Sequence, residues 1–193
     1  QMFYTEVTAM KFCVLMGSPR KNGNTQALLN LFTKQLTGEY KTVNAYYSQI
    51  SPCIDCRYCQ KHGKCCKKDG MEEIYSFTRD CDNILIASSV FFSELTPPLL
   101  GVLSRFQAFY CSRRFLGNKP VTKNKKGALL LTGGGDGDFD IAEKSGKILL
   151  KIMGADGEIP LIYCGSTDFT KAEDNEETVK KVLELAEAFE KQI

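Results

Sequence analysis

Five short apolar runs alternate with amphipathic segments along the chain, and this alternation sets the expected fold. The apolar runs are nearly continuous, which is typical of parallel strands that are buried on both faces. They span residues 11–16, 42–47, 83–90, 127–131 and 159–164. We therefore predict five strands in one parallel sheet.

Between these runs, apolar side chains recur every three or four residues, as in helices that bury one face. The predicted helical faces span residues 28–36, 71–78, 99–110, 141–152 and 179–189. Thr96 precedes Pro97 and is predicted to cap the third helix, because proline suits the first helical position. Asp69, with Glu72 three places on, is predicted to open the second.

Strand–helix alternation predicts an α/β fold, a doubly wound five-stranded parallel sheet with helices on both faces. Five strands suit the flavodoxin-like order, in which ligands bind beyond the carboxyl ends of the strands. The 193 residues are expected to form a single domain,. Residues 1–9 precede the first strand as an extension, and residues 51–68 form a cysteine-rich loop.

The charge balance argues against several classes of partner. The chain has 25 basic and 23 acidic residues, a net charge of +2, which favours neither a nucleic-acid nor a membrane-surface partner,. No apolar run reaches the roughly 20 residues that a spanning helix needs. Residues 1–9 lack the basic and apolar regions of a secretory signal,. We expect a cytoplasmic protein.

The loop after the first strand reads GSPRKNGNT, residues 17–25, and runs straight into a helix. The N-terminus of a helix attracts anions through its free N–H groups and its dipole, and Arg20 adds a permanent charge. No Gly-Lys-Ser/Thr ends the loop, so nucleotide triphosphate hydrolysis is not expected. A phosphate monoester fits this loop; the alternative is an ordinary capped turn.

The loop after the third strand, SSVFFSELTPP, places Phe91 and Phe92 where polar residues are usual. They either stack against a planar ring or fold back onto the core. The loop after the fourth strand, TGGGDGDFD, differs from a dinucleotide fingerprint because Asp138 replaces the third glycine,. It also differs from a calcium loop, in which Ile141 would be glycine and Lys147 glutamate,. Its glycines allow the backbone to approach a flat ligand closely.

The cysteine-rich loop has the spacing C-x2-C-x2-C-x5-C at Cys53, Cys56, Cys59 and Cys65. Three thiols at steps of three can converge on one iron–sulfur cubane, and a fourth can follow a few residues on. Cys66 is a spare or a competitor for the fourth position. Zinc sites usually pair C-x2-C units across a longer gap, and a C-x2-C disulfide would leave two cysteines unexplained.

The other candidate residues have simpler interpretations. His62, the single histidine, is interpreted as an exposed loop residue, and without a second histidine a Ser-His-Asp hydrolase has little support,. Cys13 and Cys164 lie on predicted strands and are interpreted as core residues, whereas Cys81 and Cys111 belong to no recognisable constellation. Five basic residues surround the cysteines, as a docking patch for an acidic redox partner or as a solvated loop: Arg57, Lys61, Lys64, Lys67 and Lys68,.

Over residues 10–193 the chain resembles the iron–sulfur flavoproteins within the NADPH-dependent FMN reductase group, which are flavodoxin-like. The motifs are GSPRKNGNT, the cysteine block with KKDGMEEIY, ASSVFFSELTPPLLGVLSR and KGALLLTGGG. The resemblance implies FMN and a [4Fe-4S] cluster held by the four cysteines named above. It implies phosphate contacts from Ser18, Arg20, Asn22, Asn24 and Thr25, ribityl and ring contacts from Ser89, Val90, Phe91, Phe92 and Ser93, and further ring contacts from Gly133, Gly134 and Gly135. At Ser89 the family usually has proline, so the contacts at that edge are less well defined.

Three functions follow as hypotheses. The first is an FMN oxidoreductase with a cluster, fed by NAD(P)H or reduced ferredoxin, in which the flavin supplies the chemistry and no catalytic side chain is required. The resemblance implies a homodimer or homotetramer, with the flavin near a subunit interface. The second is an NAD(P)H-dependent FMN or quinone reductase without a cluster. The third is a flavodoxin-like electron carrier or metal-sensing module with no substrate of its own.

Overall fold

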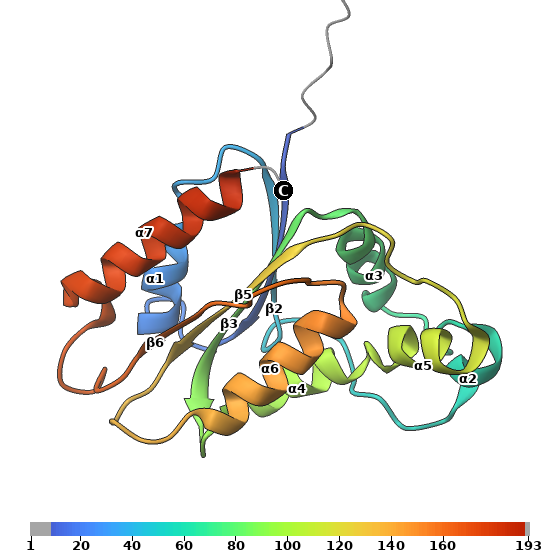
Figure 1. Cartoon of the computed structure of the whole chain (residues 1–193). Coiled ribbons are helices and arrows are strands. Elements are labelled where there is room, and N and C mark those ends of the chain that lie inside the picture. Colours follow the sequence, from blue (N-terminus) through green and yellow to red (C-terminus); the bar gives the residue numbers. More distant parts are fainter. Residues whose placement is uncertain (1–8, 192–193) are drawn as a thin grey trace, which may run out of the picture.

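The computed structural model describes residues 9–191 and confirms the α/β fold (Figure 1). Most of the predicted extension, residues 1–8, lies outside the described residues. Five parallel strands pair in the order β2-β1-β3-β5-β6, which is the flavodoxin-like order, and a short β4 pairs antiparallel with β3. The strands are β1 (Lys11–Gly17), β2 (Glu39–Asn44), β3 (Asn83–Phe91), β4 (Glu94–Leu95), β5 (Lys126–Thr132) and β6 (Leu161–Cys164).

Helices cover both faces of the sheet, as predicted. Successive strand residues point to opposite faces, so Val14 of β1 and Leu85 of β3 pack under α1 and α7, whereas Leu15 and Ile86 pack under the other helices. Two buried cores result, one on each face. The helices are α1 (Asn24–Thr33), α2 (Tyr58–His62), α3 (Met71–Asp80), α4 (Pro97–Ser104), α5 (Gln107–Leu116), α6 (Asp140–Ile152) and α7 (Glu176–Glu190), with a 3₁₀ turn η1 (Ala172–Asp174).

Strand β2 begins and ends three residues earlier than the sequence predicts. The two tyrosines that extended the apolar run lie in a turn instead, because Asn44 ends the strand. Its side-chain oxygen accepts the N–H of Tyr46 at 3.0 Å, and its carbonyl accepts the N–H of Tyr47 at 3.1 Å. Polar residues are tolerated at 39–41 because β2 is an edge strand and pairs with β1 alone,.

The predicted helix over residues 99–110 is wrong as a single element. It is broken at Arg105 and Phe106, whose N–H groups bond back by only three residues to Val102 and Leu103. The turn changes direction, so α5 buries Ala108, Phe109, Cys111 and Ser112 and leaves Tyr110 43% exposed. The predicted face therefore applies to α4 only.

Both residues predicted to open a helix lie at its start and also contact another element. Thr96 is the N-cap residue of α4, but its hydroxyl donates to the carbonyl of Gly17 at 3.3 Å. Asp69 precedes the N-cap Gly70 of α3; it accepts the N–H of Met71 at 3.2 Å and also pairs with Arg105. Each side chain thus ties a loop to a neighbouring element. Among residues 9–191, no helix is long and apolar enough to cross a membrane.

Candidate functional site

The first candidate site lies at the carboxyl ends of β1, β3 and β5. The loop that follows β1 leads into α1, whose N-cap Gly23 is extended, and within the described chain no side chain caps this helix. Ser18 is buried, while Arg20 and Asn22 are exposed at the rim. Arg20 Nε lies 3.5 Å from the position that a methyl group on the N-cap Gly23 would take, so its charge is next to the start of α1. This arrangement suits a phosphate group.

The side chains of Asn24 and Thr25 are both engaged. Asn24 donates to the carbonyl of Thr167 at 3.2 Å and accepts the N–H of Ala172 at 2.9 Å, so it anchors α1 to the loop after β6. The buried hydroxyl of Thr25 lies 3.1 Å from that of Ser89 and 2.7 Å from that of Thr132. These three hydroxyls join α1 to the ends of β3 and β5.

The two aromatic residues at the end of β3, Phe91 and Phe92, do not fold back onto the core. β3 turns over at Phe92 and Ser93, both with positive φ (52° and 65°), and pairs with β4 as a hairpin. Phe91 is 44% exposed and Phe92 is fully exposed. The carbonyl of Ser93 accepts the N–H of Ala142 at 2.8 Å, which fixes the hairpin against α6. Two aromatic rings therefore face outwards at the edge of the site.

The glycines after β5 lie against the loop that follows β6. The carbonyls of Gly133, Gly134 and Gly135 accept the N–H groups of Thr167, Asp168 and Ser166 at 2.7–3.0 Å. Side chains would not fit here: a methyl group on Gly133 would lie 2.4 Å from the Tyr163 hydroxyl oxygen, and one on Gly134 would lie 2.5 Å from the Asp168 carboxylate. Bare backbone lines this side of the site.

Sequence reasoning missed the part of this site that follows β6. Thr167 bonds both Asn24 and Gly133, and Tyr163 stacks on Phe139 with ring centroids 4.1 Å apart. Burial raises the pKa of Tyr163, as does the nearby charge of Asp136, so its hydroxyl keeps its proton. The polar run GSTD directly after the last predicted strand was the available signal, because the loop after every parallel strand reaches the same edge,.

The described residues of the first site have the chemical groups that a flavin phosphate and ring require. The uncapped start of α1 and Arg20 offer N–H donors and a positive charge for the phosphate,. The glycine backbone and the exposed Phe91 and Phe92 offer a flat, partly apolar surface,. The individual contacts stay predictions, because the positions of the side chains define only the edge on which a ligand would lie.

The second candidate site is the cysteine-rich loop between β2 and α3, which packs against α5. Asp55 and Arg57 have positive φ, 47° and 58°, so the loop coils tightly and α2 follows at Tyr58. Where residues with left-handed backbone conformation alternate with right-handed ones, successive N–H groups point to the same side and line a concave surface. Such surfaces bind anions and iron–sulfur centres. The Asp55 N–H donates to the Cys53 sulfur at 3.4 Å, as this geometry predicts.

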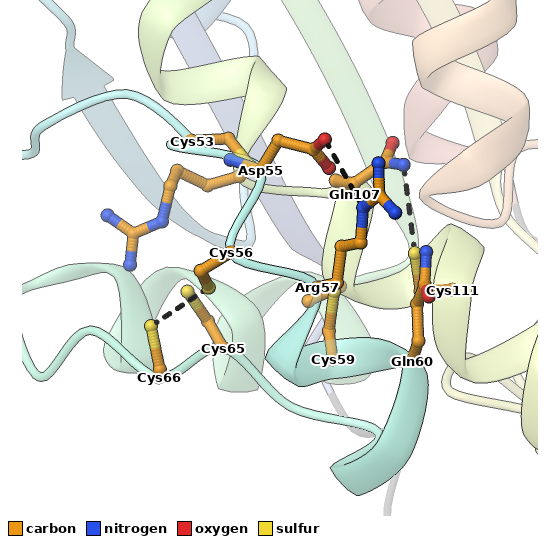
Figure 2. A pocket seen from close by; sticks show the side chains of 12 residues that line it. Cys53, Asp55, Cys56, Arg57, Cys59, Gln60, Cys65, Cys66, Gln107 and Cys111 are labelled. Carbon is orange, nitrogen blue, oxygen red and sulfur yellow. Dashed lines mark hydrogen bonds and ion pairs between the residues drawn. The ribbon is translucent and has the colours of Figure 1, made fainter.

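Six cysteines surround one hollow, and Figure 2 shows their side chains pointing into it from the loop and from α5. The cavity volume of the hollow is about 20 Å³, which is room for about one water molecule,. The Cys56 and Cys66 sulfurs lie 3.3 Å apart. The cysteines are Cys53, Cys56, Cys59, Cys65, Cys66 and Cys111. The thiols are packed closely, so the loop must widen to admit a cluster.

The local environment shifts the pKa values of Cys56 and Cys59 in opposite directions. The backbone N–H of Tyr58 lowers the pKa of Cys56, as does its contact with Cys66. Burial raises the pKa of Cys59 to about 12, and the hydrogen bond to Cys111 acts in the same direction. Because a metal binds the thiolate, binding at Cys59 releases a proton at neutral pH. Gln107 donates to the Cys111 sulfur at 3.6 Å.

These residues fit an iron–sulfur cluster by their chemistry. Thiolates and amide N–H donors are the groups that such clusters use. The buried Nε of Arg105, which lines the same hollow, has no hydrogen-bond partner within residues 9–191. Among those residues, no three His, Cys, Asp or Glu side chains are arranged for a single metal ion. A bound cluster would supply an acceptor for that free donor.

The structure confirms some of the remaining predictions for single cysteines and for the histidine and corrects another. Cys13 and Cys164 are buried core residues, as predicted. His62 is exposed and stacks on Tyr58, with ring centroids 4.0 Å apart, which supports its interpretation as a loop residue. Cys111 does belong to a constellation. The sequence could not show this, because 45 or more residues separate Cys111 from the other cysteines of the hollow.

Comparison with known proteins identifies the family of this chain. The model of the NADPH-dependent FMN reductase family matches residues 10–156. An iron–sulfur flavoprotein of Archaeoglobus fulgidus is 27% identical over 188 residues, 94% of this chain and 81% of that protein. One of Methanosarcina thermophila is 30% identical over 128 residues, 65% of this chain and 64% of that protein.

Solved structures share the fold. An FMN-dependent NADH-azoreductase from Bacillus anthracis, solved in complex with FMN, superimposes with a TM-score of 0.68 at 11% sequence identity. The superposition covers 94% of this chain and all of the azoreductase. The family model covers most of this chain, and the strand order agrees with it. This chain therefore belongs to the NADPH-dependent FMN reductase family of oxidoreductases.

Proposed function

We propose that this protein is an FMN-dependent oxidoreductase that also holds a [4Fe-4S] cluster through Cys53, Cys56, Cys59 and Cys65. When bound, FMN supplies hydride and single-electron chemistry, and the cluster exchanges single electrons. The observation that carries the proposal is the hollow in which six thiols meet amide donors and the free donor of buried Arg105. The relatives named iron–sulfur flavoprotein support it.

The role of the chain itself is to bind FMN and to orient its ring. In this proposal the first turn of α1 and Arg20 hold the FMN phosphate, and the glycine carbonyls fixed by residues 166–168 keep the backbone open for the ring. Phe91 and Phe92 cover the ring and exclude water. Thr25 and Ser89 set the spacing between the two sides of the site through their hydroxyl contact.

The electron donor is proposed to be NAD(P)H or reduced ferredoxin. Lys61, Lys64 and Lys68 are exposed on the cysteine-rich loop and suit the acidic surface of a redox protein,. The opening of the hollow lies on the same loop. An electron arriving at this surface therefore has a short path to the thiols.

The protein is further proposed to form a homo-oligomer with the hairpin at the interface. Phe92 at the tip is fully exposed, and Ile141 of α6, next to the residue that bonds the hairpin, is 54% exposed. Burying an exposed Phe is worth about 2 kcal/mol per side chain. A second subunit that covers these residues also closes the flavin edge of the site.

The cluster is tested by purification without oxygen, followed by a visible spectrum and iron and acid-labile sulfide assays. We expect flavin bands together with broad iron–sulfur absorption in the wild type. Cys56→Ser is expected to lose the iron and keep the flavin, whereas the matched core variant Cys164→Ala keeps both. Flavin without iron in the wild type would reject the cluster and support an FMN or quinone reductase instead.

The flavin site is tested by titration with FMN and with riboflavin. Arg20→Gln is expected to weaken FMN binding at least tenfold, since a hydrogen bond to a charged group is worth about 1.5–3 kcal/mol. Riboflavin lacks the phosphate, so its affinity should not change. Lys34→Gln, at the far end of α1, is the control. Equal affinity of Arg20→Gln and wild type for FMN would contradict the phosphate site.

A further inference from the structure

Arg105 is the largest fully buried side chain of the described chain, and neither candidate site as predicted from sequence includes it. It lies in the break between α4 and α5, where its own carbonyl accepts the Tyr75 hydroxyl at 2.6 Å. Its side chain is 0% exposed. A buried guanidinium is costly unless its donors are satisfied, so the contacts of each nitrogen indicate its role.

Two of its three nitrogens close the cysteine-rich loop. Nη1 donates to the carbonyl of Ser51 at 2.9 Å and to the Asp69 carboxylate at 2.7 Å, and Nη2 donates to the other Asp69 oxygen at 3.1 Å. Ser51 lies two residues before Cys53, and Asp69 lies three residues after Cys66. One planar side chain therefore holds both ends of the loop together.

Neighbouring contacts strengthen this closure. Lys67 donates to the Ser51 hydroxyl at 2.7 Å and to the Pro52 carbonyl at 2.8 Å, which bridges the same two ends from the outside. Ser104, next to Arg105, accepts the N–H of Cys53 at 3.0 Å. The first cysteine is thus fixed to the helix break as well.

The third nitrogen is directed to no protein acceptor. Nε of Arg105 is buried without a hydrogen-bond partner among residues 9–191, and the side chain lines the hollow of the cysteines. Asp69 and then Cys65 raise the pKa of Arg105 against the effect of burial, so the Cys65 thiol lies near this guanidinium. The neighbouring Cys66 is exposed and contacts Cys56 instead.

Arg57 provides a natural contrast. It lines the same hollow, but its side chain is 72% exposed and its Nε lies 3.6 Å from the Asp55 carboxylate. Figure 2 shows that Arg57 and Asp55 both come from the loop itself, so their pair does not join the loop to another element. Both arginines place one positive charge at the hollow. Of the two, only Arg105 joins the cysteine-rich loop to the break between α4 and α5.

We propose that Arg105 is the positioning residue of the cluster site: it closes the cysteine-rich loop and, through its free Nε–H, makes Cys65 rather than Cys66 the fourth ligand. The second half of this proposal rests on the proposed cluster. The first half concerns the chain alone. A donor beside Cys65 would favour its sulfur as a ligand of the proposed cluster, whereas Cys66 is exposed and contacts Cys56.

The first experiment uses metal-free protein and measures hydrogen–deuterium exchange of residues 51–69. Arg105→Met and Arg105→Lys are expected to speed exchange of this segment at least tenfold, with the lysine variant less affected, while Arg57→Met leaves it unchanged. The lysine variant keeps the buried charge, so it decides the result if Arg105→Met does not fold. Unchanged exchange in a folded Arg105 variant would overturn the closure.

The second experiment measures iron per chain after anaerobic reconstitution. With Arg105 present, Cys65→Ser is expected to retain under one tenth of the wild-type iron and Cys66→Ser all of it. In the Arg105→Lys background the two variants should differ by less than twofold. If Cys66→Ser loses the iron, the assignment of Cys65 fails. If the Lys background leaves the contrast intact, Arg105 does not select Cys65 and its proposed role fails. Wild type without any iron would refute the cluster itself, and the exchange experiment would still decide the closure.

Discussion

The hydroxyl of Thr25, in the first turn of α1, lies 2.7 Å from the hydroxyl of Thr132 at the end of β5. Thr25 also contacts Ser89 of β3, so one buried side chain connects α1 to the ends of β3 and β5. The contact spans 107 residues of sequence. It makes the spacing of the site dependent on a single hydroxyl.

Thr25→Val is therefore expected to destabilise the fold by about 1–3 kcal/mol, because it leaves buried hydroxyls without their partner. FMN affinity should fall with it, since the distance between α1 and β3 is then less strictly fixed. Urea unfolding and FMN titration measure the two effects. Thr33→Val is the control: its hydroxyl contacts only its own helix, at 3.4 Å from the Asn30 carbonyl. Equal stability of the two variants would show that the hydroxyl contact is unimportant.

Gly133→Ala is expected to cost about 1–3 kcal/mol in unfolding free energy and to weaken FMN binding, because the new methyl group overlaps Tyr163,. Gly137→Ala, in the same loop, has nothing within 4 Å of its added methyl group and should behave as wild type. The pair is compared by thermal unfolding and flavin titration. A stable, flavin-binding Gly133→Ala variant would mean that Tyr163 moves aside freely.

The Asp69–Arg105 pair predicts a specific pH dependence. Arg105 lowers the pKa of Asp69 in the folded protein. A lowered carboxyl pKa adds stability above the unfolded value of about 3.9, and this stability is lost as the pH falls through the folded value. Asp69→Asn should therefore reduce stability by about 3 kcal/mol at pH 7 and show a shallower loss below pH ~4.

The measurement for this pair is the urea midpoint between pH 7 and pH 2.5, compared with that of the exposed control Glu187→Gln on α7. The control should follow the wild-type curve. Parallel curves for wild type and Asp69→Asn would show that the ion pair does not contribute to acid unfolding.

Phe92→Glu is expected to convert the proposed homo-oligomer to a monomer, because the side chain is fully exposed at the tip of the hairpin and a charge there opposes burial,. Multi-angle light scattering with size-exclusion chromatography measures the mass. Phe115→Glu, a similar change on α5 where Phe115 is 54% exposed, should leave the mass unchanged. A monomeric wild type would contradict the proposed assembly.

Much of the fold follows from local pattern. Continuous apolar runs located all five parallel strands, and their alternation with helices gave the doubly wound topology,. The predicted ends of helices and strands were wrong where a single polar side chain makes contacts that override the apolar pattern. Asn44 ended β2 early by capping Tyr46 and Tyr47. At Arg105 the helix broke although the apolar period continued through Phe106, because the period alone carries no information on a buried ion pair.

The sequence by itself determined the order of the five parallel strands along the chain and the fact that the loops after β1, β3 and β5 share one edge, because strand period and chain handedness are local properties. It also determined the thiol spacing of the cysteine-rich loop. Tertiary structure alone decided that Cys111 and Arg105 meet those thiols, that Thr25 meets Thr132, and that the loop after β6 closes the glycine backbone. Such contacts join residues tens of positions apart, and burial in a common core, which no local pattern encodes, brings them together.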